Sequence, residues 1–205
     1  MVWNDKRISD WAQAGGVTPF DAACVNPASL DLRLGDLIRE PHQVWLDMTR
    51  EEMKESIALG EIEDLPKWGE AKRFDKFWLF PGEFVLCHSL ELVRIPIYVA
   101  SILVLKSSKG RLGLNHSHSG WGDPGFGLPK TKSMSVVNVN GDYDLGGAAW
   151  TWELQNISPW PIKLTAGERL IQQVFFDMSD APDIDYRYTG HYVYQSGPTP
   201  ARDKS

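Results

Sequence analysis

The stretch WTWELQNIS, residues 150–158, alternates large apolar side chains with polar ones and carries one acidic residue. Side chains of a β-strand point alternately to its two faces. Trp152 and Leu154 are therefore predicted on one face of a strand, and Glu153 on the opposite face with Thr151. Two interpretations of Glu153 stay open: a surface carboxylate, or a partly desolvated carboxyl group suited to passing a proton near neutral pH.

Similar strand patterns occur along most of the chain. Each run is rich in apolar residues and is bounded by a glycine, a proline or a polar turn. The further runs are SLDLRLG (29–35), FVLCHSLELVRI (84–95), VASILVLKSS (99–108) and PIKLTAGERLIQQVFF (161–176). Together they predict an all-β fold, a sandwich or a barrel, in one domain that covers residues 1–205.

Four segments depart from the strand pattern. Residues 4–14 predict a short helix that begins at Asn4 as its N-cap. Residues 49–63 fit a helix or a charged excursion, and residues 128–147 fit a long loop or an added hairpin. The tail, residues 195–205, is expected to be extended unless a ligand or a neighbour holds it.

The composition narrows the range of partners. The chain has 205 residues, a net charge of -6 and 42% hydrophobic residues, which fits one globular domain. An acidic balance disfavours general nucleic-acid binding, which depends on Lys and Arg, although a local basic cluster can still bind a free nucleotide. Cys24 and Cys87 lie in apolar surroundings and are predicted to be buried thiols.

Targeting signals are not evident in the sequence. The charged beginning, residues 1–11, lacks the apolar segment of a signal peptide, and no later apolar run reaches membrane-spanning length. We therefore expect a cytoplasmic protein without a membrane partner.

Zinc chemistry is disfavoured by the residue pattern. Zinc deaminases of nucleobases use H-x-E and P-C-x-x-C motifs, because zinc needs imidazole or thiolate ligands at tetrahedral spacing. Neither cysteine has a partner at that spacing. His116 and His118 could share a strand face, but a polar pair is the simpler interpretation because no third ligand is near them in the sequence.

Two polar segments are candidates for nucleotide contacts. KSSKGR, residues 106–111, combines cations, hydroxyls and a glycine, as polyphosphate binding requires. It is not a Walker A loop, and in isolation a polar exit from a strand explains it better. Asp123 lies in a Pro-Gly turn, GDPGF (122–126), where a surface role and a functional role are equally plausible.

Eight segments, taken in order, resemble the dCTP deaminase branch of the dUTPase superfamily. They are NDKRISDW (4–11), NPASLDLRLG (26–35), FPGEFVLCHSLELVRIP (80–96), KSSKGRLGL (106–114), GWGDPGF (120–126), WELQN (152–156), PIKLTAGERLIQQ (161–173) and HYVYQSGPTPAR (191–202). The resemblance implies a dUTPase-like β-sandwich that assembles as a homotrimer with active sites between subunits. It also implies an insertion at 128–147 and a C-terminal segment, 186–205, that closes over the nucleotide.

The resemblance assigns four catalytic roles. Glu153 would be the general base and acid for the attack of water on C4 of cytosine. Ser107 and Arg111 would place that water and steady charge. Asp123 would hold the sugar or, in members that hydrolyse dUTP, activate the water that attacks phosphorus. Magnesium would arrive with the triphosphate, and no zinc is implied.

The remaining site residues are implied to bind the substrate, a dCTP- or dUTP-type nucleotide. Thr151 and Trp152 would flank the base through their backbone. The other predicted substrate-binding residues are Lys106, Ser108, Lys109, Gly110, Gln172, Tyr186, His191 and Gln195.

Several residues depart from the family pattern. Lys106 replaces an arginine, His118 and Ser119 replace Thr-Ala, and Gly122 replaces an isoleucine. We hypothesise that His118 and the insertion reshape the pocket, for instance for a modified cytosine. The GW at 120–121 is similar to members that both deaminate dCTP and hydrolyse dUTP.

Three functions remain as alternatives. The leading one is deamination of dCTP, and the second is a dUTP diphosphatase or a bifunctional enzyme that uses Asp123. The third, of another class, is a non-catalytic nucleotide-binding regulatory protein.

Overall fold

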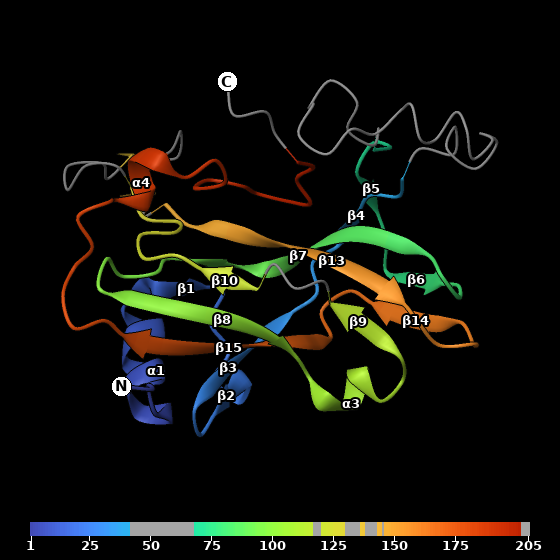
Figure 1. The fold of residues 1–205 in the computed structure, drawn as a ribbon, viewed down its shortest axis with the longest axis horizontal. Helices are drawn as coiled ribbons and strands as arrows, with labels where there is room; N and C mark the ends of the chain where they lie inside the picture. The colour runs from blue at the N-terminus through green and yellow to red at the C-terminus, as the bar shows by residue number, and fades with distance from the viewer. Residues whose placement is uncertain (42–67, 117–119, 130–135, 138–142, 145, 202–205) are drawn as a thin grey trace.

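The computed structural model describes residues 1–41, 68–116, 120–129, 136–137, 143–144 and 146–201. Within them the protein is mainly β and forms two facing sheets, with short helices at the ends of strands (Figure 1). The predicted all-β sandwich is therefore confirmed. The stretch 49–63, for which a helix or a charged excursion was predicted, lies outside the described residues.

The first helix begins where the sequence predicts, but its α-helical part ends at Trp11 rather than at Ala14. α1 (Asp5–Trp11) begins after Asn4, whose side chain accepts a hydrogen bond from the backbone N–H of Arg7 at 3.0 Å. A π-helical turn, Ala12–Gly16, follows it, and Gly15 adopts φ 92° there. A positive φ favours glycine, so the Gly-Gly pair ends the helix.

The first sheet has four strands in the order β1-β7-β13-β9, and all neighbours are antiparallel. Its strands are β1 (Val17–Thr18), β7 (Phe84–Val93), β13 (Ala148–Asn156) and β9 (Leu114–His116). β13 lies inside this sheet, between β7 and β9, so both of its edges are paired.

The second sheet has five antiparallel strands in the order β10-β8-β15-β3-β2. Its strands are β10 (Trp121–Gly122), β8 (Val99–Leu105), β15 (Arg169–Asp177), β3 (Ser29–Arg33) and β2 (Val25–Asn26). The short strand β10 forms one edge, directly beside β8.

Three two-stranded ribbons complete the described β-structure. They are β4 (Leu37–Ile38) with β5 (Lys72–Arg73), β6 (Lys76–Leu79) with β14 (Ile162–Thr165), and β11 (Val136–Val137) with β12 (Tyr143–Asp144). The last pair lies within 128–147. Of the two alternatives predicted for that segment, a long loop or an added hairpin, the hairpin is therefore the one observed.

The core is formed by the facing sides of the two sheets. Trp152 and Leu154 of β13 are fully buried in one cluster with Leu32 of β3 and Phe175 of β15. Trp3 stacks on Phe175 with 5.2 Å between ring centroids, which closes one end of this cluster.

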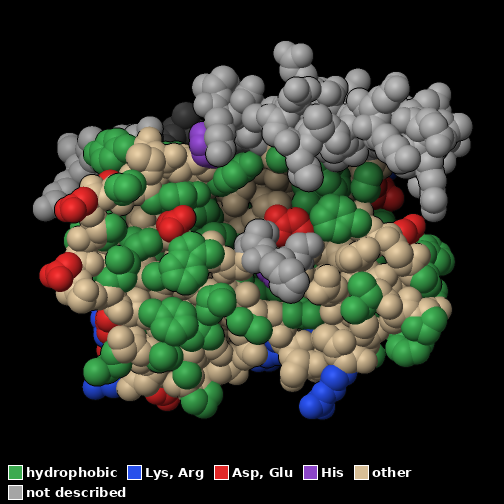
Figure 2. Space-filling model, in the orientation of Figure 1, with side chains coloured by type: hydrophobic (Ala, Val, Ile, Leu, Met, Phe, Trp, Pro, Cys, Tyr) green, Lys and Arg blue, Asp and Glu red, His purple; other side chains and the backbone are tan. Residues whose placement is uncertain are grey.

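The outward side of the second sheet exposes apolar side chains. Ile102 and Val104 of β8 are 37% and 46% exposed, and Trp121 of the neighbouring β10 is 59% exposed. Figure 2 shows hydrophobic side chains over β8 and β10 on the viewed face. A hollow of about 620 Å³ is lined by these three residues and by Leu114 and Ile157, among others. Exposed apolar surfaces of this kind are typical of contacts with another protein.

A buried ion pair joins the two sheets. The carboxylate of Glu91 on β7 accepts hydrogen bonds from the Nε and the backbone N–H of Arg33 on β3, at 2.6 and 2.9 Å. Glu91 is 3% exposed, and this burial raises the pKa of its carboxyl group although Arg33 opposes the shift. Burial is the largest single effect on the Arg33 guanidinium and lowers its pKa, but the hydrogen bond to Glu91 and the charges of Glu91, Cys24 and Asp21 together leave that pKa raised.

We expect Arg33→Met to lower the free energy of unfolding by about 3 kcal/mol, because a buried carboxylate loses its cation. The loss should shrink as the pH falls, since protonated Glu91 needs no cation and a raised folded-state pKa costs stability only as the pH rises through it. Urea unfolding at several pH values measures both effects.

Lys72→Met is the matched control, because Lys72 forms an exposed pair with Glu40 at 3.1 Å. Its cost should stay below about 1 kcal/mol. Equal losses in the two variants would contradict a structural role for the buried pair.

Candidate active site

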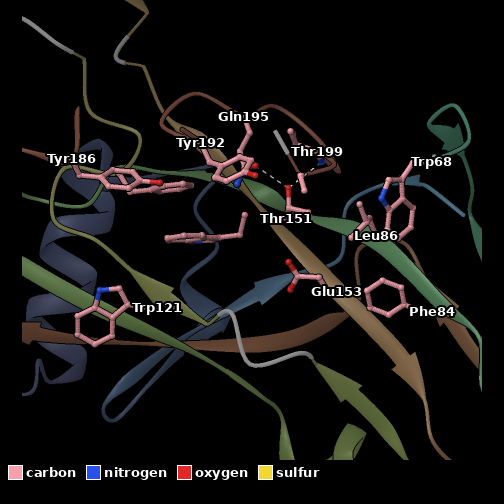
Figure 3. A pocket seen from close by; sticks show the side chains of 13 residues that line it. Trp68, Phe84, Leu86, Trp121, Thr151, Glu153, Tyr186, Tyr192, Gln195 and Thr199 are labelled. Carbon is pink, nitrogen blue, oxygen red and sulfur yellow. Dashed lines mark hydrogen bonds between the residues drawn. The ribbon is translucent and has the colours of Figure 1, made fainter. Parts of the chain in front are cut away.

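The outward face of β13 forms the centre of a cavity of about 440 Å³. Thr151 and Glu153 are half-buried on this face, while Trp152 and Leu154 point into the core. The predicted alternation is thus confirmed. In Figure 3 the carboxylate of Glu153 points into the space bounded by Trp121, Tyr186 and Tyr192.

The cavity walls are mostly aromatic. Phe126 and Trp150 stack with 3.7 Å between ring centroids and 3° between planes, and both are nearly fully buried. The remaining lining residues are Trp68, Phe84, Leu86, Trp121, Tyr186, Tyr192, Gln195, Thr199 and Ala201. A flat aromatic space with few polar groups suits a nucleobase or a sugar, which such walls can hold by stacking and packing.

A glycine-containing turn brings Asp123 to the edge of the cavity. Gly122 leaves room for the ring of Trp150, because a Cβ at this position would lie 2.9 Å from its Cη2 atom. Gly125 adopts φ 91° and Gly127 φ 72°, and a Cβ on Gly127 would lie 1.9 Å from the carbonyl oxygen of Val93. The turn therefore requires its glycines.

The C-terminal segment lies over the outward face of β13. The backbone N–H of Ala149 donates to the carbonyl oxygen of Gln195 at 2.7 Å. The Thr151 hydroxyl donates to Oε1 of Gln195 at 3.0 Å and accepts from the backbone N–H of Thr199 at 3.1 Å. Thr151 is thus the side chain on which this segment is fastened (Figure 3).

Tyr186 reaches the same cavity from α4 (Tyr186–Thr189). Burial raises the pKa of its phenol, and the negative charge of Asp123 raises it further. Tyr186 is therefore an uncharged hydroxyl beside Asp123 at neutral pH, able to donate a hydrogen bond.

The predicted site residues fall into two groups. Four line the cavity, namely Thr151, Glu153, Tyr186 and Gln195. Asp123 joins them through its hydrogen bond to the cavity residue Trp121. The side chain of Trp152 lies in the core, so only its backbone belongs to the outward face.

The second group surrounds α3 (Ser107–Gly110) and does not line this cavity. Ser107, Ser108, Gly110 and Arg111 are exposed. Figure 1 shows α3 at the lower edge of the molecule, whereas α4 and the C-terminal segment lie at the upper edge. The KSSKGR segment of the chain therefore does not line the cavity of its own Glu153.

Ion pairs fix the two lysines of this segment. Lys106 Nζ lies 2.6 Å from Oδ2 of Asp31, and Lys109 Nζ lies 3.2 Å from Oε1 of Glu168. Gln172 donates to the hydroxyl of Ser29 at 3.2 Å. Both lysines therefore share their charge with a carboxylate, whereas Arg111 of the same segment is exposed.

One further predicted residue, His191, belongs to neither group. His191 is exposed and does not line the cavity. His118 and Ser119 lie outside the described residues.

Sequence reasoning missed several cavity residues. Phe84 and Leu86 line the cavity from β7, which pairs with β13 so that Leu86 is opposite Glu153. The alternation of side chains along 84–95 indicates which residues share a face of that strand. It does not indicate that this strand pairs with β13. Trp121 was noted only as part of a GW pair, although its spacing of two from Asp123 places both on one side of an extended strand.

The described residues show neither a cluster of metal-binding side chains nor a membrane-spanning helix. The described part of the chain contains no group of three or more His, Cys, Asp or Glu side chains that could hold a metal ion. Among the same residues, no helix has the length and apolar character needed to cross a membrane.

The family model and the relatives that match this chain carry the same family name. Residues 2–178 match a family model described as dCTP deaminase-like. The chain is 35% identical over 211 residues to a "dCTP deaminase, dUMP-forming" of Leifsonia xyli subsp. xyli, covering 98% of this chain and 90% of that protein. A protein of Acidothermus cellulolyticus with the same name, "dCTP deaminase, dUMP-forming", is also 35% identical, over 208 residues. The alignment covers 98% of this chain and 95% of that protein.

A solved structure supports the fold. The 2'-deoxycytidine 5'-triphosphate deaminase of Agrobacterium tumefaciens aligns with a TM-score of 0.55 at 20% identity. The alignment covers 85% of this chain and 48% of that one, so this chain spans about half of the solved protein.

We expect Thr151→Val to loosen the C-terminal segment, because Thr199 loses its acceptor and Gln195 its donor. Hydrogen exchange at residues 195–201 should become at least about fivefold faster. Thr165→Val, on β14, is the matched control and should leave these amides unchanged. Equal exchange in Thr151→Val and the unchanged protein would show that Thr151 does not fasten the segment.

Proposed function

The chain belongs to the dCTP deaminase-like family, and from this premise we propose that it hydrolytically deaminates a deoxycytidine triphosphate without zinc. The observation that carries the proposal is the position of Glu153, half-buried on the outward face of β13 in a cavity walled by aromatic rings. A carboxylate in such surroundings can accept and return a proton.

The proposed deamination consumes one water molecule and needs no other co-reactant. Glu153 takes a proton from water as the oxygen attacks C4 of cytosine. It delivers this proton to N3, takes the second proton from the new C4 hydroxyl and passes it to the amino group, which leaves as ammonia when the C–N bond breaks and the C4 carbonyl forms. The products are dUTP and ammonia.

A second activity is proposed at Asp123, which lies beside the same cavity. Relatives of this chain are named "dCTP deaminase, dUMP-forming", a name that includes release of a monophosphate. A water activated by Asp123 would attack the α-phosphorus of dUTP, and the α–β bridging bond would break to give dUMP and diphosphate. Magnesium would enter on the triphosphate, because it takes most of its ligands from phosphate and water.

We further propose that the complete site forms between subunits of a homotrimer. The α3 group offers hydroxyls and cations, but lies away from the Glu153 cavity of its own chain. The exposed apolar side chains over β8 and β10 offer a surface on which a second copy could dock. A neighbour seated there would supply Ser107 and Arg111 to the nucleotide.

The first test separates the proposed activities by measuring ammonia, dUTP, dUMP and diphosphate from dCTP with magnesium. Glu153→Gln should slow ammonia release by at least about a hundredfold, because the general base is lost. Asp123→Asn should slow diphosphate release by at least about a hundredfold if Asp123 activates the second water. Glu83→Gln, an exposed glutamate in the turn before β7, is the matched control.

The products decide among the alternatives. Accumulating dUTP indicates deamination alone, and dUMP with diphosphate indicates both activities. Diphosphate from dUTP without ammonia from dCTP indicates a diphosphatase. Nucleotide binding without turnover indicates a regulatory protein, and undiminished ammonia release by Glu153→Gln would contradict the mechanism.

The second test mixes two inactive variants, Arg111→Ala and Glu153→Gln, by unfolding and refolding them together. If the site joins two subunits, an equal mixture should regain about a quarter of the activity, because one interface in four combines an intact Glu153 with an intact Arg111. Each variant refolded alone is the control. An inactive mixture that nevertheless contains both variants in one oligomer would show that the two residues act in the same chain.

A further inference from the structure

Trp121 and Asp123 are held together at the edge of the cavity. β10 is extended and pairs with β8, with Trp121 opposite Ile102 and Gly122 opposite Ser101. Residues two apart on an extended chain lie on the same side. The indole Nε1 of Trp121 donates a hydrogen bond to Oδ1 of Asp123 at 3.0 Å.

Gly122 makes this arrangement possible. It is buried between the two residues, and a Cβ there would lie 2.2 Å from Oγ of Ser101 and 2.9 Å from Cη2 of Trp150. Any side chain at position 122 would therefore push the strand away from Ser101 and Trp150. Close packing of Gly122 fixes the backbone on which Trp121 and Asp123 stand.

Packing does not explain the large side chain of Trp121. It is 59% exposed, so it contributes little to the core of its own chain. Its ring lines the cavity that contains Glu153 and also the apolar hollow beside β8. The indole N–H, the only polar group of this side chain, donates its hydrogen bond to the Asp123 carboxylate.

We propose that Trp121 is a positioning residue that holds the Asp123 carboxylate for its work on the nucleotide. The inference rests on the proposed function of this cavity. An indole N–H is a donor only, so it fixes one carboxylate oxygen without competing for the proton that Asp123 handles. Oδ2 then remains for the sugar hydroxyl or for the attacking water.

The location of Trp121 also links this positioning to assembly. Its ring forms a wall shared by the Glu153 cavity and the exposed apolar hollow. A second copy seated on the hollow would exclude water from the indole. A hydrogen bond to a charged group is stronger in such surroundings, so Asp123 would be held best in the assembled protein.

The test is a double-mutant cycle with Trp121→Phe, Asp123→Asn and the double variant. kcat and KM are measured separately for ammonia release from dCTP and for diphosphate release from dUTP. Trp121→Phe keeps an aromatic ring but loses the donor. We expect the step that uses Asp123 to slow by about tenfold, as for a lost bond to a charged group.

The cycle separates positioning from direct contact. If Trp121 acts through Asp123, Trp121→Phe causes no further loss in the Asp123→Asn background. If Trp121→Phe only raises KM, Asp123 holds the sugar. If it lowers the kcat of diphosphate release, Asp123 activates the attacking water. Trp78→Phe, a 54% exposed tryptophan on β6, is the matched control.

Three outcomes would overturn the inference: unchanged kinetics in Trp121→Phe, the same loss with and without Asp123, or an equal loss in Trp78→Phe. Failure of the proposed function is distinguishable from these, because the unchanged protein would then turn over neither dCTP nor dUTP. An indole ¹⁵N–¹H signal lost in Trp121→Phe and shifted in Asp123→Asn reports the bond independently of turnover.

Discussion

The burial of Trp152 and Leu154 fixes the orientation of β13, and the site depends on that orientation. Both side chains are fully buried between the sheets. A slip of one residue would exchange the two faces of the strand, exposing an indole and burying a carboxylate, and both changes are costly. Pairing with β7 and β9 on either side holds the register. Hydrophobic packing therefore places Glu153 outward, although Glu153 itself contributes little to the core.

The aromatic cavity follows from this orientation and from two close approaches of backbone. Gly122 lies under Trp150, and Gly127 lies against the backbone of Val93. These contacts bring the Phe126–Trp150 stack and Asp123 to the outward face of β13. The C-terminal segment completes the cavity through Thr151, which lies two residues before Glu153 on the same face. β13 therefore presents the Glu153 carboxylate and also holds the C-terminal segment that lies over it.

The two groups of predicted residues differ in how they are held. Thr151 and Glu153 share one strand face, and Asp123 and Trp121 share one extended edge. The lysines near α3 are instead held by Asp31 and Glu168 on the other sheet and its turns. One folded chain therefore presents a carboxylate-bearing cavity and a separate basic segment. Their separation, together with the exposed apolar face of the second sheet, is the physical basis of our proposal that the site is shared between copies.

The sequence by itself determined the all-β class, the first helix with its Asn4 cap, and the faces of β13, because capping and strand alternation act between near neighbours in the chain. Ordered motifs also identified the family. Only the tertiary structure decided that Leu86 is opposite Glu153, that Gly122 makes room for Trp150, and that KSSKGR lies away from the cavity. These facts depend on strand pairing and packing between distant segments, which local periodicity does not encode.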